Sequence, residues 1–274
     1  MIYLQTIFMA ILQGITEFLP VSSSGHMAFL NQIFERAGWG SLEEPVTLEV
    51  LFHLASLMAI LCYYWRPVLR MLMGNDWPLV KLLIFGTIPV GIVGVLAKVC
   101  FEEEFDAILQ NVQVTGVMML VTAGLLILAQ RLSRQDPKVM HEKKLRRNLK
   151  TLSPLRAFGI GCMQALAVLP GLSRSGSTIT AGLWAGLTRQ QAGTFSFLLA
   201  IPAIGAAGAA EVLKLLKNGT PSDVGLLPLV ISFVVCFVVS FCALALLVRI
   251  LRTRCIGWFA VYLIPVGILM LFFK

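Results

Sequence analysis

Six apolar runs, each close to the length of a bilayer crossing, dominate this chain. A helix needs about 20 consecutive apolar residues to cross the hydrocarbon core, where its backbone polar groups must satisfy one another. Hydrophobic residues make up 58% of the 274 residues and charged residues only 13%. The sequence therefore predicts an all-α integral membrane protein. The six expected spans are residues 46–64, 79–99, 112–132, 192–216, 224–250 and 256–273.

Two further apolar regions, 1–34 and 154–190, are each interrupted in the middle by proline, glycine and serine. The interruptions read LPVSSSG at 19–25 and LPGLSRSG at 169–176. Because a continuous helix does not tolerate such clusters, we expect each region to form a re-entrant helical hairpin. Non-helical backbone persists at bilayer depth only where protein or water satisfies it, so the two turns should meet near the membrane midplane.

The two broken regions also resemble each other, which indicates an internal repeat. Gln13 aligns with Gln164 and Ser22 with Ser173 at the same offset, and three apolar spans follow each region. Since each half then crosses the membrane three times, the two halves must have inverted topology. The expected parts are a first repeat (1–132), a basic cytoplasmic linker (133–152) and a second repeat (153–274).

Basic residues indicate which side of the membrane is cytoplasmic. The net charge of +8 would suggest nucleic-acid binding in a soluble protein, but here we interpret it as a topology signal and expect no nucleic-acid partner. The basic clusters at 66–70, 131–156 and 249–254 should share the cytoplasmic side, so the first hairpin opens outward. Lys214 and Lys217 depart from this rule, and we expect them to extend toward the outer interface.

A carboxylate and a histidine lie inside the first broken region. Glu17 is costly within a bilayer unless it is paired or hydrated, so we expect it to mark a functional site. The structural alternatives are that it caps a half-helix or pairs with Arg174 to hold the hairpins together. The SSSGH stretch ending at His26 begins a new half-helix, and helix N-termini attract anions.

The second broken region adds Arg174, whose planar guanidinium suits phosphate oxygens. Two such turns facing each other predict a cradle for a phosphate-like anion, with a carboxylate, a histidine and serines as acid, base or nucleophile. A secondary transporter or flippase for an anion or a phosphate-bearing lipid is the alternative, because inverted repeats with broken helices also build transporters. The presence of Ser23 and His26 near Glu17 favours an enzyme.

QGITEFLP with the following VSSSGH resembles the (E/Q)-x-x-x-E motif and its P-V-S-S-[ST]-G-H continuation. LPGLSRSGSTIT resembles P-G-x-S-R-S-x-x-T. Both are signatures of the undecaprenyl-pyrophosphate phosphatases of the bacitracin-resistance type, and the resemblance covers essentially the whole chain. It implies hydrolysis of undecaprenyl pyrophosphate, a polyprenyl lipid substrate, to undecaprenyl phosphate and inorganic phosphate, which recycles the lipid carrier for cell-wall synthesis. A divalent cation, Mg or Ca, is implied as cofactor.

The resemblance also implies a multi-pass protein of the bacterial inner (plasma) membrane whose active site opens to the periplasmic or outer side. A homodimer is left open. The motifs and the resemblance together assign catalytic roles to Glu17, Ser23, His26 and Arg174. Glu17 is also the candidate metal ligand. Substrate-binding roles fall to Gln13, Ser22, Ser24, Ser173, Ser175 and Thr178. Supporting positions are Glu49, His53 and Gln164.

Two points remain open at these residues. The nucleophile is either Ser23 or a water activated by His26. Glu49 and His53 share one helix face, and they either support the site or form a buried hydrogen-bonded pair. Position 13 is glutamine where related sequences also carry glutamate. Since an amide cannot act as a base, any role as a base or as a charged cation ligand concentrates on Glu17.

Overall fold

The computed structural model of the chain describes residues 2–39, 45–101, 108, 111–134, 149–218, 225–253 and 256–273. Within these residues the protein is all-helical. The α-helices are α1 (Ile2–Thr16), α2 (Ser23–Arg36), α3 (Pro45–Tyr63), α4 (Trp65–Leu72), α5 (Trp77–Cys100), α7 (Val112–Arg134), α8 (Pro154–Leu166), α9 (Arg174–Trp184), α10 (Arg189–Asn218), α11 (Leu226–Thr253) and α12 (Trp258–Phe272). A short 3-10 helix covers Leu149–Thr151. Most of the expected linker, 135–148, lies outside the described residues, as do the side chains of Lys214 and Lys217.

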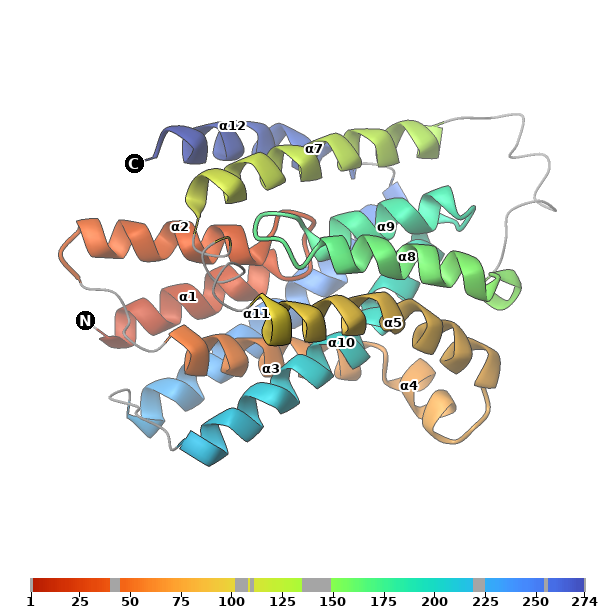
Figure 1. Cartoon of the computed structure of the whole chain (residues 1–274), viewed down its shortest axis with the longest axis horizontal. Coiled ribbons are helices and arrows are strands. Elements are labelled where there is room, and N and C mark those ends of the chain that lie inside the picture. Colours follow the sequence, from red (N-terminus) through yellow and green to blue (C-terminus); the bar gives the residue numbers. More distant parts are fainter. Residues whose placement is uncertain are drawn as a thin grey trace.

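Both predicted helix breaks are present. Helices α1 and α2 form one hairpin, and α8 and α9 form another (Figure 1). The two turns lie in the middle of the molecule, and the hairpins open toward opposite ends. Each second helix begins after a serine N-cap whose hydroxyl accepts a backbone N–H: Ser22 from Gly25 and Ser173 from Gly176. These caps satisfy amides that a helix N-terminus leaves unpaired.

Four helices, α5, α7, α10 and α11, are long and apolar enough to cross a bilayer by length and composition. Helix α3 continues into α4 after a bend of 85°, so the span expected at 46–64 ends in a sharp break. The span expected at 256–273 is shorter than expected, because α12 has only 15 residues and a length of about 22 Å. The protein is therefore a multi-pass membrane protein, and its described residues contain four such helices, or five if the bent pair counts as one.

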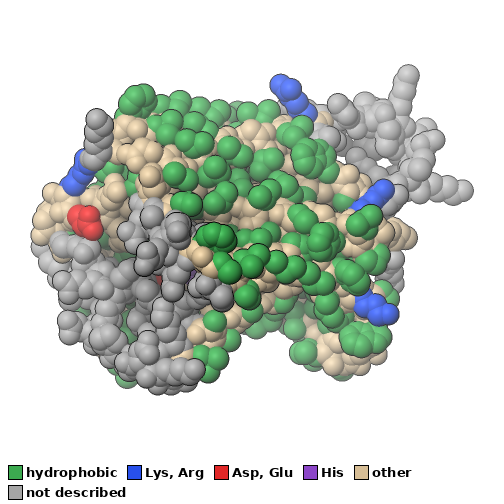
Figure 2. Space-filling view, in the orientation of Figure 1, with side chains coloured by type: hydrophobic (Ala, Val, Ile, Leu, Met, Phe, Trp, Pro, Cys, Tyr) green, Lys and Arg blue, Asp and Glu red, His purple; other side chains and the backbone are tan. Residues whose placement is uncertain are grey.

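The surface agrees with a membrane environment. Hydrophobic side chains cover the middle of the face seen in Figure 2, whereas the Lys and Arg side chains visible there lie toward the two ends. Arg66 and Arg70, both exposed, belong to α4 at one of these ends (Figure 1).

Small residues allow the helices around the hairpins to approach closely. A Cβ atom built on Gly161 of α8 would collide with the carbonyl oxygen of Gly86 on α5. On the other side of the molecule, a Cβ on Gly116 of α7 would lie 2.8 Å from the carbonyl oxygen of Gly267 on α12. Such small-residue crossings are typical of helix packing in membranes, where van der Waals contact replaces the hydrophobic effect. They hold α8 and α12 against the long spans.

Candidate active site

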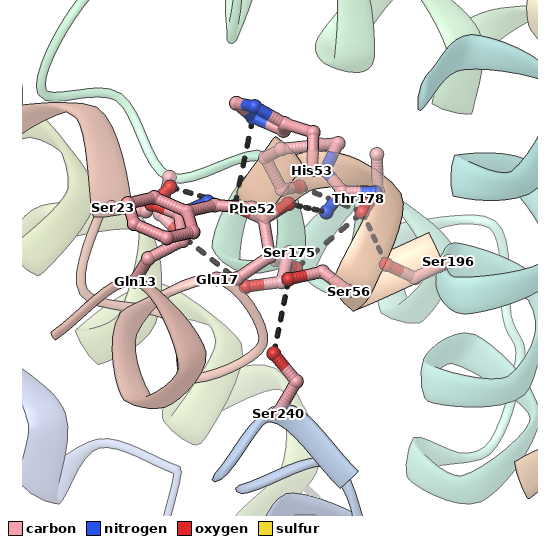
Figure 3. A network of polar contacts seen from close by, with 12 residues as sticks. Gln13, Glu17, Ser23, Phe52, His53, Ser56, Ser175, Thr178, Ser196 and Ser240 are labelled. Carbon is pink, nitrogen blue, oxygen red and sulfur yellow. Dashed lines mark hydrogen bonds and ion pairs between the residues drawn. The ribbon is translucent and has the colours of Figure 1, made fainter. Parts of the chain in front are cut away.

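The carboxylate of Glu17 lies where the two hairpin turns meet (Figure 3). Its Oε1 atom accepts a hydrogen bond from Nη2 of Arg174 at 2.5 Å. Its Oε2 atom accepts from Nε2 of Gln13 at 2.9 Å and from the hydroxyl of Ser23 at 2.8 Å. The Glu17 side chain is only 4% exposed. Three donors from both hairpins therefore converge on one buried carboxylate.

The three hydrogen bonds to Glu17 fit both a structural role and a chemical role for this carboxylate. The Glu17–Arg174 pair is the contact expected if Glu17 holds the hairpins together, because breaking a buried pair leaves an uncompensated charge. The same geometry brings a hydroxyl within hydrogen-bond reach of a carboxylate, and a nucleophile next to its base is the arrangement that covalent catalysis requires. Gln13 orients the carboxylate and adds no charge.

The start of α9 presents a compact set of hydroxyl groups beside Arg174. The Ser173 and Ser175 hydroxyls lie 3.2 Å apart. Thr178 donates to the backbone carbonyl of Arg174 at 2.8 Å, and its hydroxyl lies 2.6 Å from that of Ser196 on α10 (Figure 3). Ser175 and Thr178 are almost fully buried. These contacts fix the first turn of α9, from which Arg174 projects toward Glu17.

Ser22 is the only described residue other than glycine with a positive φ. Its φ is 70° and its ψ is 101°, a conformation that costs about 1–3 kcal/mol and persists only where the surroundings hold it. The Ser22 hydroxyl accepts from the Gly25 amide at 3.3 Å and lies 3.3 Å from the hydroxyl of Ser24. The strained residue thus immediately precedes Ser23, the hydroxyl that reaches Glu17.

Helix α7 satisfies the irregular backbone of the second turn. The Thr122 hydroxyl donates to the carbonyl of Gly171 at 3.1 Å and accepts from the amide of Ser173 at 3.0 Å. Gly171 has a φ of 87°, and a side chain there would collide with the carbonyl of Thr115 on α7. The Gly171 amide also donates to the Ser24 hydroxyl at 3.4 Å. Side chains of the protein thus satisfy the irregular backbone of the second turn.

His26 points away from the carboxylate cluster. Its Nδ1 lies 2.7 Å from the carbonyl oxygen of Ser22, and its Nε2 lies 2.7 Å from the hydroxyl of Tyr262 on α12. A carbonyl oxygen only accepts, so we assign the hydrogen to Nδ1. Among the described residues, no hydrogen bond joins His26 to Ser23 or Glu17. The hydroxyl of Ser23 is therefore paired with Glu17 and not with the histidine.

Of the three supporting positions, Glu49, His53 and Gln164, only His53 contacts the Glu17 carboxylate within the described structure. Nε2 of His53 lies 4.0 Å from Oε2 of Glu17, close enough for an ion pair when the histidine is protonated (Figure 3). Nδ1 of His53 bonds the backbone carbonyl of Glu49 at 2.8 Å, while Glu49 itself is exposed. The alternative of a buried hydrogen-bonded pair between the Glu49 and His53 side chains is therefore wrong. Gln164 is 2% exposed, and in the described part of the chain its amide atoms have no hydrogen-bond partner.

Several polar residues of this region were not expected from the sequence. Tyr262 contacts His26. Figure 3 shows two further contacts: Ser196 lies against Thr178, and Ser56 of α3 lies 3.0 Å from Ser240 of α11. Their common signal is a hydroxyl group inside an apolar helix. That signal is weak, because such hydroxyls also bond their own helix backbone, as Thr87 does.

The fold and this cluster together define a multi-pass membrane protein with a buried polar site built from two broken helices. The sequence model of the family described as bacitracin resistance protein BacA matches residues 6–269. The chain belongs to this family.

Curated relatives extend the match over nearly the whole chain. An undecaprenyl-diphosphatase of Rhodopirellula baltica is 39% identical, covering 97% of this chain and 96% of the relative. An undecaprenyl-diphosphatase of Halothermothrix orenii is 34% identical, with the same coverage of both chains. One from Corynebacterium efficiens is 32% identical over 99% of this chain and 90% of its own. The similarity therefore includes both hairpins and the spans that follow them.

Proposed function

We propose that this protein is an undecaprenyl-diphosphatase of the membrane. It hydrolyses undecaprenyl pyrophosphate to undecaprenyl phosphate and inorganic phosphate, and so recycles the lipid carrier for cell-wall synthesis. Membership of the bacitracin-resistance family and the names of the full-length relatives support this activity. The observation that carries the site assignment is the convergence of Ser23, Arg174 and Gln13 on the Glu17 carboxylate.

In the mechanism we propose, Arg174 and backbone amides of the first turns of α2 and α9 bind the terminal phosphate. A guanidinium has five N–H donors, so Arg174 can contact both Glu17 and phosphate oxygens. Helix N-termini favour anions through their exposed amides and their dipole. The serine caps keep two such N-termini at the meeting point of the hairpins. These groups neutralise the charge that develops on the phosphate oxygens in the transition state.

Ser23 is the nucleophile that the geometry favours over a water activated by His26. Its hydroxyl oxygen bonds the terminal phosphorus while Glu17 accepts the hydroxyl proton. The bond from phosphorus to the bridging oxygen breaks, and undecaprenyl phosphate leaves. A water molecule then attacks the phosphoserine, releases inorganic phosphate and restores the serine. The first step uses groups in direct contact, because the Ser23 hydroxyl and Arg174 both bond the Glu17 carboxylate.

We propose a divalent cation, Mg or Ca, as cofactor. The described residues contain no group of three or more His, Cys, Asp or Glu side chains that could hold a metal by themselves. Glu17 is the carboxylate at the centre, and both its oxygens already accept hydrogen bonds. A cation bound by one carboxylate, water and substrate phosphates fits this set, as Mg²⁺ commonly binds in phosphate-handling enzymes. It would neutralise the pyrophosphate charge.

For topology, we propose two inverted repeats, 1–132 and 153–274, joined by a cytoplasmic linker at 133–152. The opposite openings of the two hairpins and the matched serine caps support this plan (Figure 1). The end rich in basic residues then faces the cytoplasm, and the first hairpin opens toward the periplasmic or outer side of the inner membrane. A homodimer stays a prediction.

The direct test is release of inorganic phosphate by the purified protein in detergent. Undecaprenyl and farnesyl pyrophosphates are supplied as substrates, with and without a chelator. Ser23→Ala should abolish turnover, whereas Ser232→Ala, which removes a buried hydroxyl of α11 outside the site, should leave it unchanged. Absence of phosphate release from the wild type, together with transport of a phosphate-bearing lipid, would favour the transporter alternative. Full activity of Ser23→Ala would show that Ser23 is not the nucleophile and would favour attack by water.

A further inference from the structure

Tyr262 reaches the hairpin region from α12, the last helix of the chain. Its hydroxyl lies 2.7 Å from Nε2 of His26, and the two rings are nearly parallel, with centroids 5.6 Å apart and planes at 10°. It is the only hydroxyl in the sequence of α12, WFAVYLIPVGILMLF. A phenol hydroxyl next to lipid needs a polar partner, so the bond to His26 satisfies Tyr262. The hydrogen bond also constrains the His26 imidazole, which has a second partner on its other nitrogen.

The other nitrogen of the His26 ring forms a hydrogen bond to the backbone carbonyl of Ser22. Because the Ser22 carbonyl can only accept, Nδ1 of His26 carries the hydrogen and Nε2 is left to accept from the Tyr262 hydroxyl. The two hydrogen bonds, each 2.7 Å long, fix both the position and the tautomer of the imidazole. His26 thereby links α12 to the residue that immediately precedes Ser23.

The second hairpin provides an internal comparison. Ser173 is its N-cap, as Ser22 is in the first hairpin, and both caps accept from the amide three residues later. Ser173 has an ordinary extended backbone, with φ −68° and ψ 119°, whereas Ser22 has φ 70° and ψ 101°. Four residues after Ser173 stands Ser177, whose hydroxyl has no partner in the described structure, where the first hairpin has His26. The strained cap thus occurs where the histidine contact is present.

We propose that Tyr262 is a positioning residue for the reaction of the proposed function. Through His26 it holds Ser22 in the positive-φ conformation, and this conformation directs the Ser23 hydroxyl to Glu17. A strained backbone persists only where surrounding contacts over-determine it, and the Tyr262–His26–Ser22 chain is such a contact. Removing the phenol hydroxyl should therefore loosen the nucleophile and leave the phosphate-binding groups, Arg174 and the helix N-termini, in place.

The first test is the kinetics of Tyr262→Phe, which keeps the ring and deletes the hydroxyl. We expect kcat to fall about tenfold, the effect of losing one hydrogen bond, while KM changes less than about twofold. Tyr3→Phe removes a hydroxyl from the exposed Tyr3 of α1 and should leave both constants unchanged. An unchanged kcat in Tyr262→Phe, or a change in KM alone, would overturn the proposal.

The second test needs no turnover and so separates failure of this proposal from failure of the proposed function. The chain has only three histidines, so ¹⁵N-histidine labelling gives a spectrum of three imidazoles. We expect His26 to show a protonated Nδ1 and an accepting Nε2, with the Nε2 signal shifted in Tyr262→Phe and not in Tyr3→Phe. A His26 signal that does not respond to Tyr262→Phe would exclude the contact.

A double-mutant cycle completes the test. If Tyr262 acts only through His26, then Tyr262→Phe should have no further effect on kcat in a His26→Ala background. Additive losses would show that Tyr262 acts by another route and would overturn the positioning role. Size-exclusion profiles of all four proteins control for folding.

Discussion

Arg174 and Glu17 are 157 positions apart in the chain and form an ion pair 2.5 Å long between the two hairpin turns. The pair places the guanidinium next to the carboxylate that also accepts from Ser23. The cationic and nucleophilic parts of the site are thus supplied by different hairpins and meet on a single carboxylate.

Arg174→Lys should lower kcat/KM by about tenfold to a hundredfold although the charge is kept. A lysine ammonium cannot bond Glu17 and hold phosphate oxygens with a planar fork, and hydrogen bonds to charged groups are worth about 1.5–3 kcal/mol. Arg249→Lys, at an exposed position of α11, is the matched control and should behave as wild type. Near-normal phosphate release by Arg174→Lys would contradict the phosphate-binding role of Arg174.

Glu17→Gln should reduce phosphate release by at least about a hundredfold. The substitution removes both the base for Ser23 and the carboxylate that a hard cation would bind at the centre of the site. A cation titration at fixed substrate and detergent measures this. Substantial activity with an unchanged cation requirement would mean that Glu17 is structural, as in the ion-pair alternative.

Gln13→Glu should be tolerated only when cation is present. The new carboxylate would lie about where the Gln13 amide now donates to Glu17 at 2.9 Å, and two carboxylates at that distance repel unless a cation lies between them. We expect a lower cation concentration for half-maximal rate and lower activity in chelator than the wild type has. An unchanged cation titration would argue against a metal near these two positions.

Gly161→Ala should destabilise the protein by about 1–3 kcal/mol, because the added methyl group would press on the Gly86 carbonyl where α8 crosses α5. Gly159→Ala lies on the same helix, and a Cβ there would meet no described atom within 4 Å apart from its chain neighbours and the nearby backbone of its own helix. It should be neutral or stabilise α8 by up to about 1 kcal/mol. Thermal unfolding of the two variants in one detergent compares them. Equal melting temperatures would show that the crossing tolerates a side chain.

The proposed orientation is tested by single cysteines in a background that lacks the native cysteines. A membrane-impermeant thiol reagent applied to intact cells should label Arg36→Cys, at the open end of the first hairpin, and should not label Arg252→Cys, near the end of α11. Both residues are at least partly exposed, so reactivity reports the side of the membrane. The reverse labelling pattern would invert the topology.

Much of the fold could be predicted from the sequence because its two signals are local. Apolar length predicts spans, and proline, glycine and serine clusters predict breaks, so α5, α7, α10, α11 and both hairpins lie where expected. The bend between α3 and α4 was not predicted, since Tyr64 and Trp65 carry no breaking signal and the next proline is Pro67. Such bends depend on tertiary packing.

The residues of the site were likewise predicted only where a local sequence motif marked them. The motifs identified Gln13, Glu17, Ser23 and Arg174, which the structure brings into direct contact. The orientation of His26 and the presence of Tyr262 could not be read from the motifs. They depend on where α12 lies against α7, and that placement follows from the Gly116–Gly267 crossing between residues far apart in the chain.

The Glu17–Arg174 pair also has a consequence for how the protein is made. Synthesis proceeds from the N-terminus, so the first hairpin leaves the ribosome before Arg174 exists. Until the second hairpin arrives, Glu17 has no guanidinium partner, and a lone carboxylate resists entry into hydrocarbon. The first hairpin should therefore remain near the membrane surface and take its final depth only when the second half inserts. Assembly of this membrane protein then ends, rather than begins, with its N-terminal segment.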